Sequence, residues 1–205
     1  MPLLKSWNIQ NTTKAAIWKI EEPITFFTDE TGIDCEIHNE IRKTEHLAGR
    51  FLLKYLEPAF PLNQIFIDEF RKPLLPNHLF HFSISHSFPY VAVVVGKEPL
   101  AGIDVQTWHK RISDIQHKFL SSAEQNLIGG RPENITLAWC AKESAYKWHG
   151  RHGVDFIEHL PITKFSNGEI IDITIRTNFY DSSCEINLKS MIHADFACTY
   201  INSIQ

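Results

Sequence analysis

Seven residues, Tyr90–Gly96 (YVAVVVG), form an almost continuous apolar run that sets the strongest limit on how this chain folds. A short valine-rich run of this kind is typical of a buried strand. LFHFSIS, which alternates at Phe80, Phe82 and Ile84, precedes the run, and AGIDVQ follows it. We therefore expect three strands joined by short turns in the middle of the sequence.

Helical and strand-like patterns follow one another along the rest of the chain. KAAIWKI (14–20) predicts a first strand, and QIFIDEF (64–70) predicts another. IRKTEHLAGRFLLKYL (41–56) has an apolar helical face and should end before Pro58. EIIDITIR, CEINLKS and ADFACTYI return to a two-residue period near the C-terminus.

Two further helical regions lie between these strands. One or two short helices are expected over 113–128, with Ser121 or Ser122 as N-cap. A longer helix is expected over 135–148, capped by Asn134 and followed by Gly150. The mixed order predicts an α+β fold, with a boundary between two half-domains near Pro99 or Gly102.

Composition excludes several classes of protein. A chain of 205 residues with 43% hydrophobic and 21% charged residues is globular, and it forms one large domain or two small ones. The net charge of −4 gives no general attraction to nucleic acid. No apolar run reaches the roughly 20 residues of a membrane helix, and the N-terminal segment lacks the apolar stretch of a signal peptide. We therefore expect a soluble cytoplasmic protein.

Cysteine and histidine patterns indicate no structural metal site. The four cysteines, Cys35, Cys140, Cys184 and Cys198, form no CxxC pair, so buried free thiols are expected rather than a zinc knuckle or a redox motif. The 11 histidines include no HExxH pair.

WCAKESAYK (139–147) places charged side chains on one predicted helical face. At 100° per residue, Trp139, Lys142, Glu143, Tyr146 and Lys147 share that face, while Leu137, Ala138, Ala141, Ala145 and Trp148 lie opposite. A simple surface pair between Glu143 and Lys147 would explain this arrangement. The alternative is a functional site with Asp104, an acid inside an apolar strand. Asp104 and Gln106 share a strand face, so their oxygens and Glu143 suit a hard cation such as Mg²⁺.

HFSISHS (81–87) adds a histidine at a strand end. His86 can donate a hydrogen bond to a phosphate oxygen there, although a plain strand leading into the turn at Pro89 also explains the pattern. Ser85 and His86 point to opposite faces, which argues against a nucleophile and base pair.

Basic residues recur every four positions on the helix predicted over 41–56. Arg42, His46, Arg50 and Lys54 form this stripe, which is either a solvated face or a surface for an anion. Arg71 and Lys72 add positive charge in a predicted turn before Pro73. A polyphosphate ligand would suit these groups.

Taken in order, RKPLL, FSISHS, GIDVQ, FLSSAE and WCAKESAYK resemble the motifs of the 4′-phosphopantetheinyl transferases, specifically the longer, surfactin-synthetase-activating type. The family pattern W-x-x-K-E-x-x-x-K is matched in full by Trp139, Lys142, Glu143 and Lys147. The resemblance spans Arg71 to Lys147.

The resemblance implies an enzyme that transfers the 4′-phosphopantetheine arm of coenzyme A to a serine of an apo acyl- or peptidyl-carrier protein. Coenzyme A is then the co-substrate, and adenosine 3′,5′-bisphosphate is the product. The family fold consists of two similar α+β halves in a monomer with internal pseudo-two-fold symmetry, with coenzyme A between them. These halves would be residues 1–100 and 101–205, the second carrying the metal and catalytic motifs.

The same resemblance assigns roles to residues. Asp104, Gln106 and Glu143 would hold Mg²⁺, and Glu143 or a water it orders would accept the serine proton. Lys147 and His86 would act in catalysis and contact phosphate. Coenzyme A would be bound by those two residues together with Arg42, Arg50, Arg71, Lys72, Ser85 and Lys142.

Two positions depart from the family pattern, since Gln106 stands where many members have Glu and Arg71 stands where the turn usually has Gly. The first removes a charge near the metal, and the second bears on backbone geometry. Glu124, the acid of FLSSAE, is expected near the metal and the carrier surface. Two other classes stay open: a coenzyme A-binding or carrier-docking module without catalysis, and a metal-dependent phosphohydrolase. No partnership with nucleic acid or membrane is expected.

Overall fold

The computed structural model describes residues 2–10, 12–179 and 183–205. The chain divides into two compact units, Met1–Ala101 and Gly102–Gln205. Each unit combines an antiparallel sheet with helices, so the architecture is a mixed α and β one, as the sequence predicted.

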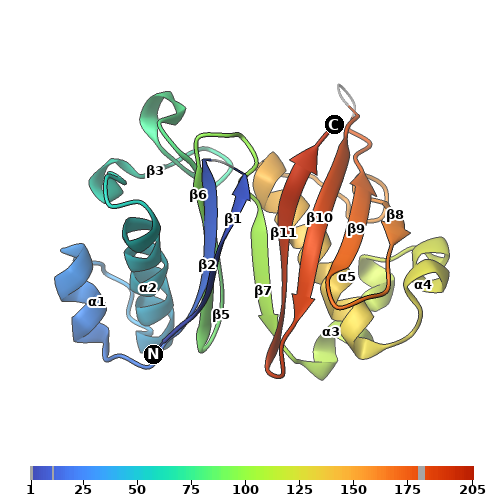
Figure 1. Ribbon diagram of the computed structural model, residues 1–205, viewed down its shortest axis with the longest axis horizontal. Coiled ribbons are helices and arrows are strands. Elements are labelled where there is room, and N and C mark those ends of the chain that lie inside the picture. Colours follow the sequence, from blue (N-terminus) through green and yellow to red (C-terminus); the bar gives the residue numbers. More distant parts are fainter. Residues whose placement is uncertain (1, 11, 180–182) are drawn as a thin grey trace. The chain divides into compact units, whose positions relative to one another are not determined.

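The first unit is a four-stranded antiparallel sheet in the order β1-β2-β6-β5. Its strands are β1 (Leu3–Gln10), β2 (Thr13–Lys19), β5 (His81–Ser87) and β6 (Tyr90–Gly96). Helix α2 (Glu40–Leu56) packs on this sheet, and α1 (Ile24–Thr31) packs on α2 (Figure 1). Two short strands, β3 (Phe66–Ile67) and β4 (Pro73–Leu74), form a separate pair, and single 3-10 turns span Leu62–Gln64 and Pro76–His78.

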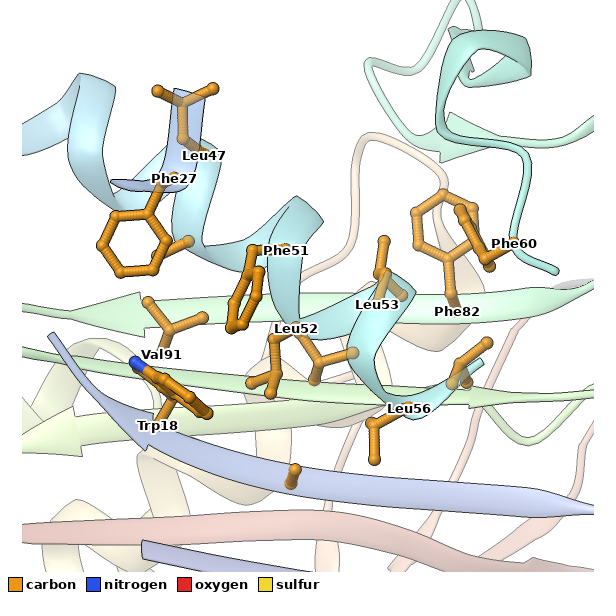
Figure 2. Close-up of a cluster of buried hydrophobic side chains, with 14 of the residues drawn as sticks. Trp18, Phe27, Leu47, Phe51, Leu52, Leu53, Leu56, Phe60, Phe82 and Val91 are labelled. Atoms are coloured by element: carbon orange, nitrogen blue, oxygen red, sulfur yellow. The ribbon is translucent and has the colours of Figure 1, made fainter. Parts of the chain in front are cut away.

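The core of this unit lies between α2 and the sheet (Figure 2). Phe51 of α2 meets Trp18 of β2 edge to face, with ring centroids 5.1 Å apart, and it meets Phe27 of α1 at 5.7 Å. Every residue of Tyr90–Gly96 is buried, as the apolar run predicted. The apolar face predicted for the helix over 41–56 is buried except at Tyr55, which is 49% exposed, so α2 is fixed mainly by its packing rather than by local propensity.

The second unit has a five-stranded antiparallel sheet in the order β7-β11-β10-β9-β8. The strands are β7 (Ile103–Thr107), β8 (Ile162–Phe165), β9 (Ile171–Arg176), β10 (Glu185–Ile192) and β11 (Phe196–Ile204). Helix α5 (Pro132–His149) packs on β7 and β11. The short helices are α3 (Lys110–Asp114) and α4 (Ser122–Ile128), with a 3-10 turn at Gln116–Lys118 (Figure 1).

The two units share a connection pattern. In the first, β2 leads through α2 to β5 and β6, and the last strand β6 returns to pair with β2. In the second, β7 leads through α5 to the strands that end in β10 and β11, and β11 returns to pair with β7. Each unit therefore contains a strand that leads to a long helix, followed by a hairpin whose last strand pairs with the strand that precedes the helix.

Several local predictions were wrong or incomplete. The strand containing KAAIWKI is the second, since β1 precedes it, and QIFIDEF contributes only the two residues of β3. Asn134 does not cap α5, which begins at Pro132, because its side chain donates to the carbonyl oxygen of Ile128 at 2.6 Å.

Two predictions about helix ends are confirmed. Ser121 is the N-cap of α4, and Gly150 ends α5 at a φ of 76°.

All four cysteines are free thiols, as expected, although only Cys140 and Cys198 are buried. In the described part of the chain, no helix combines the length and the apolar character that crossing a membrane requires.

Candidate active site

Strand β7 and helix α5 place three of the predicted site residues together in the second unit. Asp104 lies in β7 opposite Thr199 of β11 and is only 5% exposed. The backbone at Gly102, just before β7, touches α5 so closely that a Cβ there would collide with the carbonyl oxygen of Ser144. The Ser144 hydroxyl donates to the Thr199 carbonyl at 2.9 Å, which also fixes α5 to the sheet. The site thus depends on a close helix-to-strand approach that glycine permits.

Lys147 neutralises Asp104 within this site. Its Nζ lies 2.6 Å from Asp104 Oδ1 and donates a second, longer bond of 3.4 Å to the Ile103 carbonyl. The lysine side chain is 26% exposed and the aspartate side chain is 8% exposed. Such a shielded pair holds both groups in place while leaving part of the ammonium open to a ligand.

Glu143 supplies the second carboxylate, one turn before Lys147 on α5. Burial, and after it the Asp104 carboxylate, raises the pKa of Glu143 to about 7, while Lys147 opposes the rise. Within the described residues, its carboxylate forms no hydrogen bond or ion pair. It is therefore a carboxyl group held close to another acid, with a pKa in the range that suits proton transfer near neutral pH.

Gln106 lies two residues after Asp104 in β7, opposite Ala197 of β11. Its side-chain amide donates to the Thr107 carbonyl at 3.3 Å, and the residue is half-buried. Strand periodicity places Gln106 and Asp104 on the same face of β7.

The donor set fits a divalent cation only if a ligand completes it. No group of three or more His, Cys, Asp or Glu side chains that could hold a metal occurs among the described residues. Two nearby carboxylates and an amide oxygen are nevertheless hard ligands of the kind that Mg²⁺ takes together with phosphate oxygens and water. Burial, and after it the charge of Asp104, raises the pKa of Glu143, and a cation held between the two acids would oppose that rise.

Cys140 is a neighbour of this site that the sequence analysis did not assign. Burial raises the pKa of the Cys140 thiol well above its usual range, and the Asp104 carboxylate, which also forms a hydrogen bond with the thiol, raises it further. Cys140 therefore stays protonated and supports Asp104 from the protein interior. Its place inside WCAKES was the only signal in the sequence.

Lys142 lies away from this cluster, although it directly precedes Glu143. Its side chain is 0% exposed and its Nζ lies 2.5 Å from Glu124 Oε1, with a further bond of 2.7 Å to the Phe156 carbonyl. Burial lowers the pKa of Lys142, and the bond to Glu124 opposes this effect. The predicted division of α5 into a charged face and an apolar face was wrong at this position, because a buried acid compensates the lysine.

Glu124 is the centre of a buried network. One oxygen accepts from the backbone amide and hydroxyl of Ser121, both at 2.8 Å, and so completes the capping box of α4. The other oxygen accepts from the Ile162 amide of β8 at 2.9 Å and from Lys142. Glu124 therefore joins α4, α5 and β8.

A separate pocket of about 620 Å³ lies in the first unit. Helix α2 contributes its basic side, while β5, the β3–β4 segment and the loop before α2 contribute mainly apolar side chains. The lining residues are Ile37, Arg42, Glu45, His46, Arg50, Ile67, Pro73, Ile84 and His86. The volume suits a small organic ligand that carries both an apolar part and negative charge.

Two guanidinium groups supply most of the pocket's positive charge. Arg42 is exposed, and Arg50 is half-buried and donates to the His46 carbonyl at 3.1 Å. Burial, and then Arg50 and His86, lowers the pKa of His46 to about 4, so His46 is neutral near pH 7. Lys54 does not line the pocket, because its Nζ donates a hydrogen bond to the Glu30 carbonyl oxygen at 2.6 Å.

The close packing of α2 on β5 shapes this pocket. A Cβ at Gly49 would lie 2.7 Å from Ile84 Cγ2, so glycine permits the helix to approach the strand. Ile84 and His86 share one face of β5 and both line the pocket, as the alternation predicted. Ser85 is 4% exposed and does not line it.

Glu45 is the pocket residue that the sequence analysis missed. Its Oε2 lies 3.1 Å from His86 Nδ1, and its Oε1 accepts the Phe88 amide at 3.0 Å. The signal in the sequence was a single acid inside the basic stripe of TEHLAGR.

Arg71 and Lys72 lie in the turn between β3 and β4. Arg71 has a φ of 62°, a left-handed conformation that favours glycine. Asp68 Oδ1 stabilises the turn by accepting the amides of Phe70 at 2.9 Å and Lys72 at 2.7 Å. Burial lowers the pKa of Lys72, while Asp68 opposes this shift. The turn therefore has the left-handed backbone conformation that glycine favours, although Arg71 occupies the position.

The structure thus gathers the predicted residues into two groups, one in each unit. Asp104, Glu143 and Lys147 form a carboxylate site beside Gln106 in the second unit. Arg42, Arg50 and His86 line the pocket of the first.

Comparison with known proteins gives partial matches. Residues 101–201 match the model of the 4′-phosphopantetheinyl transferase superfamily. Enterobactin synthase component D of Escherichia coli (strain K12) is 32% identical over 113 residues, which cover 52% of this chain and 54% of that protein. The protein of the same name from Salmonella typhimurium is 26% identical over 140 residues, covering 65% of this chain and 56% of that protein. The chain spans about half the length of the curated relatives it matches.

Proposed function

We propose that this chain is a 4′-phosphopantetheinyl transferase of the longer, surfactin-synthetase-activating type. It moves the phosphopantetheine arm of coenzyme A to a serine of an apo acyl- or peptidyl-carrier protein. The observation that carries the proposal is the carboxylate site of Asp104, Glu143 and Lys147, built from the two motifs that lie inside the matched segment 101–201. The adenosine 3′,5′-bisphosphate part of coenzyme A leaves as the second product.

In balanced form, the serine Oγ attacks the phosphorus that bears the pantetheine arm. The new P–O bond replaces the bond to the bridging pyrophosphate oxygen, and that oxygen leaves on adenosine 3′,5′-bisphosphate. The serine proton goes to Glu143, or to a water that Glu143 orders. An ionised carboxylate can accept this proton either directly or through the ordered water.

Asp104 and Glu143, with the Gln106 oxygen, would hold Mg²⁺. The ion would supply charge neutralisation at the pyrophosphate oxygens. Lys147 orients Asp104 through its 2.6 Å contact, donates a second proton to the Ile103 carbonyl and directs its third proton to a phosphate oxygen. Cys140 holds Asp104 from the buried side.

The residues of the first unit recognise the nucleotide end of coenzyme A. Arg42, Arg50 and His86 bind the 3′-phosphate, and the apolar side chains of Ile37 and Ile67 suit the adenine ring. Arg71 and Lys72 add positive charge for the phosphates. Strand β5, in which Ser85 is buried, holds His86 in position. Lys142 acts on this site only by fixing α5 through Glu124, since its side chain is fully buried.

The shared connection pattern of the two units supports a chain built of two similar halves, 1–100 and 101–205, that works as a monomer with internal pseudo-two-fold symmetry. The second half carries the metal and catalytic motifs. The cytoplasmic location expected from the sequence stays a prediction.

The direct test is the intact mass of candidate apo-carrier proteins after incubation with the protein, coenzyme A and Mg²⁺. We expect a mass gain of one phosphopantetheine group. Asp104→Asn should abolish the gain, and Asp172→Asn should not, because Asp172 is an exposed acid of β9 in the same unit. If coenzyme A binds tightly and no carrier gains mass, the chain is a binding or docking module instead.

A further inference from the structure

An acid lies among the basic groups of the pocket in the first unit. Glu45 is 7% exposed and lines the pocket with Arg42, Arg50 and His86. A free carboxylate there would repel any anionic ligand and would also be costly to bury. The contacts of the Glu45 carboxylate must therefore compensate its negative charge.

Both oxygens of Glu45 face donors. Oε1 accepts the backbone amide of Phe88, which follows the end of β5, at 3.0 Å. Oε2 lies 3.1 Å from Nδ1 of His86, the exposed histidine near that strand end. At this distance a hydrogen bond between the two atoms needs a proton on Nδ1, because a carboxylate can only accept. The side chain of His86 is 49% exposed, so its Nε2 is the nitrogen left for a ligand.

We propose that Glu45 is a positioning residue for the anion pocket, acting through His86. Glu45 fixes the imidazole ring and keeps Nδ1 protonated. His86 can then donate from Nε2 to a phosphate monoester only as the imidazolium cation, and Glu45 compensates that cation from the buried side. This inference rests on the proposed function, which supplies the 3′-phosphate of coenzyme A as the ligand.

No other described residue that lines the pocket carries a carboxylate that could pair with His86. Arg42 and Arg50 extend from α2, and His46 of the same helix is neutral near pH 7. Ile67 and Pro73, from the β3 and β4 side, are apolar. Within the described lining, Glu45 is thus the one acidic side chain, and it contacts the one histidine of β5 that lines the pocket.

The first test uses the unmodified protein and needs no catalysis. Long-range ¹H–¹⁵N spectra report which imidazole nitrogens carry protons. We expect Nδ1 of His86 to be protonated in the free protein, and both nitrogens to be protonated once adenosine 3′,5′-bisphosphate is bound. An unprotonated Nδ1 in the free protein would overturn the inference, whatever the activity of the protein.

The second test is calorimetric titration with coenzyme A and with 3′-dephospho-coenzyme A. In Glu45→Gln, the amide oxygen can still accept the Phe88 amide, but the amide nitrogen faces His86 Nδ1 and favours the neutral Nε2–H form. We expect coenzyme A to bind about tenfold more weakly, because the hydrogen bond from Nε2 to the 3′-phosphate loses its positive charge, with little change for the dephospho analogue.

Glu40→Gln is the matched control, since it removes the same charge from an exposed position on α2 and should leave both affinities unchanged. In a His86→Ala background, Glu45→Gln should have much less effect, because the group it positions is gone. Wild-type affinity for coenzyme A in Glu45→Gln would reject the positioning role. If the wild type does not distinguish the two ligands, the 3′-phosphate assignment fails instead, and the nitrogen spectra still decide whether Glu45 holds the Nδ1 proton.

Discussion

Arg71 has a backbone conformation that a side chain opposes. Its φ of 62° lies in the left-handed region, which costs a non-glycine residue roughly 1–2 kcal/mol. Glycine would remove that cost, but it would also raise the conformational entropy of the unfolded chain, which offsets part of the gain in stability. We expect Arg71→Gly to raise the free energy of unfolding by about 0.5–1 kcal/mol, measured by urea denaturation. Arg71→Ala is the control, because it removes the charge and keeps the Cβ, so an equal gain there would show that the effect is not conformational.

His46 makes stability depend on pH. Its pKa is about 4 in the folded protein, below the ordinary value of about 6.5. Between these values the unfolded chain binds more protons, so the contribution is complete above about pH 6.5 and is lost as the pH falls towards 4. His46→Asn should reduce this loss. Discounted for the partial exposure of the ring, the difference at low pH should be on the order of 1 kcal/mol. Parallel curves of unfolding free energy against pH for the two proteins would contradict the prediction.

Gln106 should make metal binding depend on coenzyme A. With Asp104 and Glu143 as the ionised ligands, Mg²⁺ should bind weakly until the pyrophosphate adds oxygens, and each ligand should then tighten the other by the same factor. Gln106→Glu should strengthen Mg²⁺ binding to the free protein, because it adds a third carboxylate. Calorimetric titration of Mg²⁺ with and without coenzyme A measures both effects. Equal affinities in the two wild-type titrations, or no tightening in the variant, would remove Gln106 from the metal's surroundings.

At the scale of elements, the pair of Lys142 and Glu124 joins α5 to α4 and β8. Removing one partner of a fully buried pair leaves an uncompensated charge, which typically costs about 3–5 kcal/mol. Lys142→Met should therefore be strongly destabilising. The double variant Lys142→Met/Glu124→Gln should be more stable than Lys142→Met alone, since it removes the buried carboxylate charge that has lost its lysine. The single amide oxygen of the glutamine can accept from Ser121 or from Ile162 but not from both, so the double variant should stay below the wild type. Chemical denaturation of the three proteins tests this, and a double variant no more stable than the single one would show that the pair is not coupled.

Elements with a strong periodic signal were predictable from the sequence. The helix over 41–56 became α2, Tyr90–Gly96 became a buried strand, and Ser121 caps α4. The short elements α1 and β8 were missed, because their sequences contain too few residues to show a period and owe their form to tertiary contacts. Asn134 was wrong as a cap because Pro132, a favoured first residue of a helix, begins α5 earlier.

The site was predictable only where residue chemistry is unusual for its surroundings. An acid in the apolar strand β7 pointed to Asp104, and the spacing of Glu143 and Lys147 placed both near one helix face. The partners of Lys142 and His86 were not predictable. Glu124 lies 18 positions before Lys142, and Glu45 lies 41 positions before His86, so only the tertiary fold brings each pair together.

At the scale of the whole molecule, each compact unit has its own buried core. Leu53 belongs to the core of the first unit and Ile173 to that of the second, and both are 0% exposed. Truncating either to alanine should cost about 2–5 kcal/mol within its own unit. We expect calorimetry to show unfolding that departs from a single two-state transition, with Leu53→Ala and Ile173→Ala each lowering a different component. A single transition that both variants lower equally would show that the units unfold as one.

The neighbours Lys142 and Glu143 have different partners although they are adjacent in one short motif. Lys142 is buried against Glu124, while Glu143 faces Asp104. Under the proposed function, a descendant that kept this structure and lost the transferase reaction would be free to change Asp104 and Glu143, but it would have to keep Lys142 and Glu124 or change them together. Genome sequences can therefore be sorted by these two pairs: a chain that retains only the buried pair should be a folded, inactive relative.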